Sequence, residues 1–364
     1  MVSRLAIVGT GLIGASVGLA AKHAGAYVSG WDPDAGALAV AAERGALDEP
    51  APSVESALRD ADLAVVAAPI GALPREVAAV LTASVESTTV TDVGSTKASV
   101  VAAARSPRFV GGHPICGLEA HGPEHAAAAL FDGATWFLTP TAETDPARYR
   151  LVHGFVSELG AVPAAIDPAA HDRLVALTSH LPHVLANVVV NQAGSVRVEG
   201  HEPLATAGGS LRDMTRIAGA NPRIWVDIFR DNADAVREAL AEHRRRIEEV
   251  EAALARDDAD YIAGWVGEAA ENRRRMLERA YPDARDLHQL RVHIPDRPGA
   301  FAEVTQALGA ERINIEDFEM QHISPELGGT LTLLVAGADE ARRGAALLEA
   351  RGYAAVVSAI LDEA

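Results

Sequence analysis

The chain has 364 residues and a formal net charge of −18 at pH 7, so it is long enough for two or three domains. The charge argues against nucleic acid or an anionic membrane as a partner. Apolar residues make up 49% of the sequence and aromatic residues only 4%, which is typical of a soluble, helix-rich α/β protein, and the single cysteine excludes an intramolecular disulfide and favours a cytoplasmic location.

Residues 1–165 alternate short apolar runs with Ala-rich segments, which predicts a Rossmann-type domain with a doubly wound, mostly parallel sheet. Glycines interrupt the first run and argue against a signal peptide or a membrane span there. Ligands of such a sheet bind at the carboxyl ends of its strands. The predicted strands are residues 5–9, 27–31, 62–69, 88–94, 108–114 and 135–140.

A glycine-rich motif follows the first predicted strand. Residues 9–14 match GxGxxG, whose glycines allow a tight turn, a close approach of the pyrophosphate and close packing of helix on strand. Asp32 ends the second strand, where a carboxylate binds a ribose hydroxyl and favours NAD over NADP. The alternatives are a flavin cofactor and Asp32 as a helix N-cap. The predicted cofactor-binding residues are Gly9, Gly11, Leu12, Ile13, Gly14, Asp32 and Pro69.

Three loops at predicted strand ends, residues 67–71, 92–97 and 111–119, are expected to meet beside the nicotinamide. In the second loop Ser95 and Lys97 could cap the next helix, and Ser95 could also contact a ligand. His113 precedes a proline, so its backbone is extended. A histidine there could accept the proton of a substrate hydroxyl while hydride leaves for NAD, and we favour this role over a structural one.

From residue 166 to residue 282 the strand pattern stops, which predicts a helical substrate and dimerisation domain. Residues 174–194 are apolar almost all round and indicate a helix buried in a core or an interface. Residues 224–258 form a charged stretch with helical periodicity.

Two pairs of polar residues stand out in this helical part. His180 and His183 share one helix face, although Pro182 disturbs that turn. No third ligand with metal spacing is evident, so we predict no metal. Arg216 follows Asp213 at i+3; it could hold a substrate carboxylate, or the two could form a structural ion pair.

Residues 281–286 read as a linker, and residues 287–364 show the order βαββαβ of a small ferredoxin-like α+β domain. Backbone amides at a helix start suit a carboxylate, so this domain could bind an amino-acid effector. A turn without any ligand is the alternative. The candidate effector-binding residues are Asp296, Arg297, Gly299, Asn314 and Ile315.

The ordered motifs GTGLIGAS, DVGSTK, GGHPICGLE, LTSHLPH and GGSLRDMTRIA resemble the prephenate/arogenate dehydrogenase family of tyrosine biosynthesis, over about residues 4–280. The segment PDRPGAFAEVTQALGAERINIEDFEM resembles an ACT domain, a regulatory module that binds amino acids and that some members of the family carry. The resemblance implies an NAD-dependent enzyme without a metal, which dimerises through its helical domain.

The resemblance also implies roles for single residues. His113 corresponds to the catalytic histidine that hydrogen-bonds the ring hydroxyl, and Arg216 to the arginine that binds a substrate carboxylate. Ser95 and His183 match positions that contact the substrate, with His180 close by. Three further residues match the acidic partners of the arginine and the loop near the substrate side chain: Glu119, Asp213 and Gly209.

This chain departs from the family pattern at two places. Ile115-Cys116 stands where the family more often has Met-Ala, and His121 replaces a small residue. Cys116 is interpreted as a small packing residue, whereas His121 could change the charge of the pocket or face solvent. The substrate therefore stays open between prephenate, arogenate and an amino-substituted analogue.

The favoured function is NAD-dependent oxidative decarboxylation of prephenate by a homodimer, with feedback by an aromatic amino acid such as tyrosine. A β-hydroxyacid or imine-reducing dehydrogenase is a second hypothesis, but those families use a lysine of the helical domain and residues 167–286 contain none. A non-catalytic amino-acid sensor is a third, which the intact glycine motif, His113 and Arg216 oppose.

Overall fold

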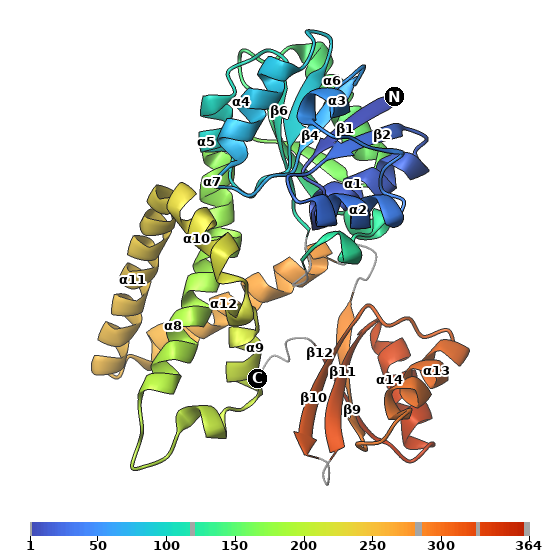
Figure 1. Cartoon of the computed structure of the whole chain (residues 1–364). Coiled ribbons are helices and arrows are strands. Elements are labelled where there is room, and N and C mark those ends of the chain that lie inside the picture. Colours follow the sequence, from blue (N-terminus) through green and yellow to red (C-terminus); the bar gives the residue numbers. More distant parts are fainter. Residues whose placement is uncertain (1, 117–120, 281–285, 325–327, 360–364) are drawn as a thin grey trace. The chain divides into compact units, whose positions relative to one another are not determined.

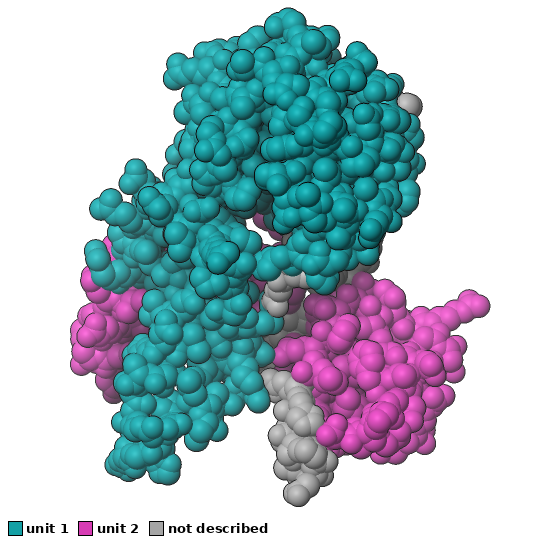
Figure 2. Space-filling view, viewed as in Figure 1, with its two compact units in different colours: residues 1–244 teal, residues 245–364 magenta. Residues whose placement is uncertain are grey.

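The computed structural model describes residues 2–116, 121–280, 286–324 and 328–359. The chain divides into two compact units, residues 1–244 and residues 245–364 (Figure 1, Figure 2). Each unit is described by itself. The three domain ranges expected from the sequence stay a prediction.

Eight strands of the first unit form one sheet in the order β3-β2-β1-β4-β5-β6-β7-β8. All neighbouring strands are parallel except β6 and β7. The predicted doubly wound, mostly parallel sheet is confirmed, and the short strands β3 and β8 are additions to it. The strands are β1 (Arg4–Val8), β2 (Tyr27–Trp31), β3 (Glu49–Pro50), β4 (Leu63–Val66), β5 (Thr89–Asp92), β6 (Phe109–Pro114), β7 (Thr135–Thr139) and β8 (Val162–Ala165).

Helices cover both faces of this sheet, so its central strands are apolar on both sides. Leu5 and Ile7 of β1 are buried in one cluster with residues of α1, α2 and α6. Ala6 and Val8, which point to the opposite face, are buried in a second cluster with α4 and α5. The helices of this part are α1 (Leu12–His23), α2 (Ala35–Glu43), α3 (Val54–Ala57), α4 (Leu73–Ala83), α5 (Ala98–Ala103) and α6 (Pro146–Glu158), with short 3₁₀ turns at Pro123–His125 and Ala128–Phe131.

Helices make up most of the chain between residues 168 and 280. They are α7 (Pro168–Val175), α8 (Leu181–Ser195), α9 (Gly209–Thr215), α10 (Pro222–Asp231), α11 (Ala233–Ala255) and α12 (Ala259–Ala280), with 3₁₀ turns η4 (Pro203–Thr206) and η5 (Arg216–Gly219). A wide π turn, η3 (Ala176–His180), joins α7 to α8. It precedes Pro182, which lacks the backbone N–H that a regular helix would use there.

Residues 168–195 form the one helix within the described ranges that is long and apolar enough, by length and composition, to cross a membrane. Its polar residues His171, Asp172 and His180 are nevertheless buried. Apolar side chains such as Leu177 and Val188 are more than half exposed in the single chain. A polar inner face with an apolar outer face is the pattern of a helix that packs against protein on more than one side.

The second unit contains a four-stranded antiparallel sheet in the order β10-β11-β9-β12. Figure 1 shows α13 and α14 on the same face of this sheet, and buried residues of both helices join the core of the sheet. The predicted βαββαβ order is confirmed. Its elements are β9 (Leu287–Ile294), α13 (Ala300–Ala310), β10 (Asp317–Ser324), β11 (Gly328–Ala336), α14 (Ala338–Glu349) and β12 (Ala354–Ala359).

Candidate active site

The glycine-rich turn joins β1 to α1 and packs tightly against neighbouring backbone. Gly9 has a φ of +99°, and a Cβ on it would lie 2.5 Å from the Ala67 carbonyl oxygen. A Cβ on Gly14 would lie 1.9 Å from the Gly9 oxygen, so α1 could not approach the turn. A Cβ on Gly11 would meet no atom of the chain within 4 Å. Packing therefore explains Gly9 and Gly14, whereas Gly11 leaves open space, and the approach of a pyrophosphate to it stays a prediction.

Asp32 at the end of β2 holds this turn in place. Its carboxylate accepts the backbone N–H of Thr10 at 2.6 Å and that of Asp34 at 2.9 Å. The N-cap of α2 is Asp34, which accepts the Gly36 N–H at 2.8 Å. The alternative that Asp32 caps the helix is thus wrong, because the second carboxylate of the loop takes that role.

The other predicted cofactor residues also lie at this edge of the sheet. Leu12 and Ile13 form the first turn of α1, where backbone amides favour an anion. Pro69 lies in the loop after β4, and its carbonyl accepts the Leu73 N–H at 2.9 Å. The turn, the helix start and a carboxylate at the end of β2 together fit NAD, which accepts hydride when it is bound.

A buried ion pair joins the ends of β5 and β6. Lys97 and Asp92 are both 0% exposed, and the Lys97 ammonium donates to the Asp92 carboxylate and, at 2.8 Å, to the Gly112 carbonyl. Asp92 also accepts the backbone N–H groups of Gly94 at 2.9 Å and Gly112 at 3.0 Å. Burial lowers the pKa of Lys97, and Asp92 opposes that shift. The alternative that the Lys97 side chain caps a helix is wrong, because the side chain is buried in this pair.

The start of α5 is capped from elsewhere in the chain. Asp172 of α7 accepts the backbone N–H groups of Lys97 and Ala98, each at 2.8 Å. Ser95 is not needed for this cap and is partly exposed in the loop before it. The cap alternative for Ser95 is therefore wrong as well, and its contact with substrate stays a prediction.

His113 stands near the end of β6, beside the ion pair. It is partly exposed, and its Nδ1 lies 2.9 Å from Nε2 of the fully buried His171. Nδ1 of His171 lies 2.8 Å from the Asp172 carboxylate. Burial, followed by the neighbouring His171, Lys97 and His180, holds the pKa of His113 well below its ordinary value. His113 is therefore neutral at pH 7 and chemically able to accept a proton.

The two histidines of the LTSHLPH motif surround a tryptophan. The His183 ring stacks on Trp225 of α10 with centroids 3.5 Å apart, and its Nδ1 donates to the Ser179 carbonyl at 3.1 Å. His180 is 2% exposed, packs edge-on against Trp225 and contacts Asn232 at 3.1 Å. Burial lowers the pKa of His180 to about 4 and that of His183 below its usual range. Both rings are thus neutral. His183 contacts Trp225 with its flat face, and His180 contacts Trp225 edge to face.

Arg216 is exposed on the turn η5, which packs against α8. Asp213 and Gly209 belong to α9, directly before that turn; Asp213 is exposed and Gly209 is partly exposed. Their roles at a substrate remain predictions. Glu119 lies outside the described residues. Among the described residues no group of three or more histidine, cysteine, aspartate or glutamate side chains could hold a metal ion.

The residues that depart from the family pattern have distinct surroundings. Cys116 packs against the core of the nucleotide-binding part, and burial raises its pKa to about 11, which supports a packing role for a neutral thiol. Ile115 is 44% exposed. The exposed His121 has its Nε2 3.4 Å from the side-chain nitrogen of Asn221, which caps α10. His121 is therefore adjacent to the helix that carries Trp225.

Four residues of this site were not predicted as functional, namely Asp92, His171, Asp172 and Trp225. A His-Asp pair in the first two turns of α7 was the available signal for His171 and Asp172. Trp225 sits in α10, whose apolar residues recur on one face.

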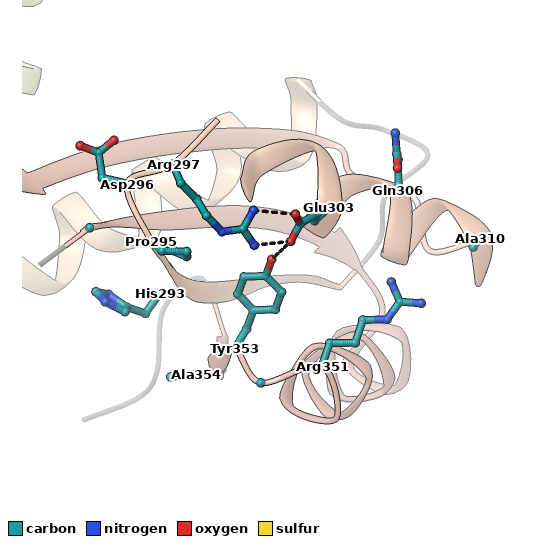
Figure 3. A pocket seen from close by; sticks show the side chains of 12 residues that line it. His293, Pro295, Asp296, Arg297, Glu303, Gln306, Ala310, Arg351, Tyr353 and Ala354 are labelled. Carbon is teal, nitrogen blue, oxygen red and sulfur yellow. Dashed lines mark hydrogen bonds and ion pairs between the residues drawn. The ribbon is translucent and has the colours of Figure 1, made fainter. Parts of the chain in front are cut away.

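The second unit holds a pocket of about 840 Å³ whose described lining includes Asp296 and Arg297 (Figure 3). Arg297 donates to both oxygens of Glu303 at 2.6 and 2.7 Å, and the Tyr353 hydroxyl donates to Glu303 at 2.6 Å. These hydrogen bonds lower the pKa of Glu303 to about 2. Arg351 also lines the pocket, and its side chain has no hydrogen-bond partner within the described ranges.

The other three effector candidates are not among the described lining residues. Gly299, with a φ of +89°, precedes α13. Asn314 donates to Glu316 at 2.7 Å, and Ile315 packs against the core of the unit. The structure thus brings Asp296 and Arg297 to one cavity, but not the Asn314-Ile315 pair.

Known proteins match over most of the chain. Family models match residues 17–164 (prephenate dehydrogenase, nucleotide-binding domain), residues 167–268 (prephenate dehydrogenase, dimerization domain) and residues 288–352 (ACT domain). A prephenate dehydrogenase of Bacillus subtilis is 30% identical over 361 residues, which are 96% of this chain and 97% of the relative. The chain belongs to the prephenate dehydrogenase family.

Solved structures of this family share the fold. A crystal structure of the A. aeolicus prephenate dehydrogenase in complex with hydroxyphenyl propionate and NAD⁺ superposes with a TM-score of 0.71 and 27% identity, covering 75% of this chain and 98% of that chain. Synechocystis arogenate dehydrogenase gives 0.68 and 25%, covering 75% and 99%. This prephenate dehydrogenase family member is an NAD-dependent oxidoreductase, so the family, fold class and cofactor predicted from the sequence are confirmed.

The glycine turn gives a paired prediction. Gly14→Ala places a Cβ against the Gly9 oxygen, and we expect it to lower the melting temperature by several degrees, because such overpacking costs about 1–3 kcal/mol. Gly11→Ala is the matched variant: its methyl group meets no atom of the chain, so the melting temperature should stay unchanged while NAD affinity falls by about tenfold. Thermal unfolding and NAD titration measure both. Equal stability of wild type and Gly14→Ala would contradict the packing role.

Proposed function

We propose that this enzyme oxidatively decarboxylates prephenate to 4-hydroxyphenylpyruvate, with NAD as the hydride acceptor, and that it serves tyrosine biosynthesis in the cytoplasm. The observation that carries the proposal is the placement of a neutral His113 at the carboxyl end of β6, on the same edge of the sheet as the glycine turn, with the aromatic cluster of His183 and Trp225 in the same unit. The names of the B. subtilis and A. aeolicus relatives support prephenate as the substrate.

His113 accepts the proton of the ring hydroxyl as C4 loses hydride to NAD, the ring carboxylate leaves as carbon dioxide, and His113 returns the proton to the phenolate oxygen of 4-hydroxyphenylpyruvate. Formation of the aromatic ring drives the reaction, so the protein contributes mainly orientation and placement of charge. Ser95 contacts the ring hydroxyl region, and Arg216 binds a substrate carboxylate; the resemblance to the family assigns Asp213, Glu119 and Gly209 to the same site. The stacked His183 and Trp225 supply a flat surface suited to the ring of the substrate.

Arogenate, or an amino-substituted analogue of prephenate, is the second candidate substrate. The arogenate dehydrogenase of Synechocystis is as well covered by this chain as the A. aeolicus enzyme. Ile115 is exposed, and the exposed His121 lies next to the N-cap of α10, so this chain departs from the family pattern at two exposed positions. NADH formation from purified enzyme with prephenate or arogenate tests the proposal. Turnover of arogenate alone would replace the substrate, and turnover of neither would overturn both.

The role of His113 predicts a selective loss of rate. His113→Asn removes the proton acceptor and should lower kcat by about 10²- to 10⁴-fold with NAD affinity intact. His153→Asn, at an exposed position of α6, is the matched control and should turn over like wild type. Steady-state kinetics and NAD titration decide, and an unchanged kcat of His113→Asn would remove the histidine from the reaction.

For Arg216 the expected effect lies in substrate binding. Arg216→Ala loses a charge-assisted contact with a carboxylate, so KM should rise by on the order of 10- to 100-fold, with a smaller change in kcat. The exposed Arg230 of α10 provides a matched control, Arg230→Ala. A wild-type KM for Arg216→Ala would contradict the carboxylate role.

The low pKa of His113 sets the expected pH dependence. Only the neutral ring accepts a proton, and the pKa of His113 lies below the ordinary value of about 6.5. We therefore expect kcat/KM to stay level as the pH falls from about 8 to about 6.5. It should decline only below about pH 6.5, where His113 becomes protonated. The groups facing His113 are His171, Lys97 and His180, and all three lower its pKa. A kcat/KM profile that already halves near pH 7 would contradict this assignment.

We further propose that the enzyme is a homodimer built on its helical part. The dimerization-domain model covers residues 167–268. Within that range several apolar side chains are about half exposed or more in the single chain: Leu177, Val188, Val226, Ile247, Leu254 and Trp265. Apolar surface of this kind is typical of subunit interfaces.

The ACT unit is proposed to bind an aromatic amino acid, with tyrosine as feedback inhibitor. Its pocket combines the ionised Glu303, a site for an ammonium group, with Arg351, which suits a carboxylate (Figure 3). Asp296 and Arg297 complete the polar wall. Gly299, Asn314 and Ile315 remain candidates only for contacts outside this described lining.

The pocket predicts a variant that separates regulation from turnover. Arg351→Ala should raise the tyrosine concentration for half inhibition by about tenfold or more, because the carboxylate loses its partner, while uninhibited turnover stays unchanged. Arg342→Ala, on an exposed arginine of α14 paired with Asp339, is the matched control. Inhibition that is identical in both variants would place the effector elsewhere, and no inhibition of the wild type would overturn the effector itself.

A further inference from the structure

A chain of three side chains runs from the interior to His113. Nδ1 of His113 lies 2.9 Å from Nε2 of His171, and Nδ1 of His171 lies 2.8 Å from the Asp172 carboxylate. His171 is 0% and Asp172 5% exposed. The edge of the Phe137 ring packs against His171 with centroids 5.5 Å apart, so the ring of His171 is fixed between β7 and β6.

The direction of each hydrogen bond follows from Asp172. Its two carboxylate oxygens each accept a backbone N–H group, those of Lys97 and Ala98, so the oxygen that faces Nδ1 of His171 is a hydrogen-bond acceptor. His171 must therefore donate from Nδ1. In the neutral ring Nε2 then carries the lone pair, so it accepts from Nδ1 of His113.

We propose that His171, backed by Asp172, is a positioning residue that holds His113 in the tautomer with the proton on Nδ1 and the lone pair on Nε2. This inference rests on the proposed role of His113 as proton acceptor. It names the acceptor atom: Nε2 of His113 faces the substrate hydroxyl. The other tautomer would present an N–H to that hydroxyl and could not take its proton.

The same chain receives the charge that forms during the reaction. As the substrate O–H bond breaks, an N–H bond forms on Nε2 and His113 becomes a cation, while hydride passes to NAD. Nδ1 of the cation still donates to His171, and His171 in turn contacts the Asp172 carboxylate, which ends this series of hydrogen bonds. Lys97, whose charge faces His113, acts in the opposite direction and is balanced by Asp92. After carbon dioxide has left, Nε2 returns this proton to the phenolate oxygen of the product, so His113 is neutral again for the next turnover.

Two substitutions of His171 separate this role from packing. His171→Leu removes the acceptor, and kcat should fall about 100-fold with KM and NAD affinity nearly unchanged. His171→Gln can accept the His113 N–H through its amide oxygen, so it should restore kcat to within about tenfold of wild type. The exposed His153, as His153→Leu, is the matched control. Melting temperatures show that each variant is folded.

A spectroscopic measurement tests the tautomer directly. In ¹⁵N-histidine-labelled protein, the His113 signals are those missing from His113→Asn. They should report a proton on Nδ1 in wild type and in His171→Gln, and on Nε2 in His171→Leu. A wild-type kcat for His171→Leu, beside a large loss in His113→Asn, would overturn the positioning role and leave His113 as the acceptor.

Two other results are also decisive. Equal losses in both His171 variants with an unchanged tautomer would reduce His171 to packing and overturn the inference. If His113→Asn itself retained kcat, the proposed function of His113 would fail, whereas the tautomer measurement would still report whether the hydrogen-bond chain exists.

Discussion

The buried ion pair between Lys97 and Asp92 is the constraint on which the site depends. Asp92 binds two backbone amides of neighbouring strand ends as well as the lysine, and the lysine reaches the carbonyl just before His113. Removing one partner of such a pair leaves an unpaired buried charge and typically costs about 3–5 kcal/mol. The edge where β5 and β6 end is therefore rigid, and a histidine there has little freedom to change its position.

Asp172 connects that edge to the helical part of the same unit. It caps α5 through the backbone of Lys97 and Ala98, and through His171 it reaches His113. Its own carbonyl accepts from Asn232, which also contacts His180. The Asp172 carboxylate thus caps α5 and contacts His171, and the Asp172 carbonyl is linked through Asn232 to His180. Hydrogen bonds to one residue therefore connect the nucleotide-binding sheet to the aromatic cluster.

Local patterns carried much of the prediction. GxGxxG is a contiguous motif whose packing demands are met within a few residues, and His113 was identifiable because a strand end before a proline has few conformations. Capping is also a local signal, and it makes Lys97 a possible helix cap; Lys97 does take the N-cap position of α5, but its side chain makes no cap hydrogen bond. The Lys97 ammonium instead contacts Asp92 at the end of β5 and the Gly112 carbonyl of β6, and the side chain that caps α5, Asp172, lies 75 positions away from Lys97. Contacts across such separations depend on the register of the whole sheet, which no short pattern contains.

The π turn at Ala176–His180 has a consequence for how the site is divided along one continuous helix. Each residue of an α-helix advances by about 100°, and a wider turn advances each residue by less, so α8 starts in a different angular phase from α7. His171 before the turn and His180 after it are nine positions apart, which a regular helix would place on opposite sides, yet both are buried. The π turn rotates the start of α8 relative to α7 without breaking the helix. His171 and His180 can therefore both be buried, although they belong to one continuous helical segment.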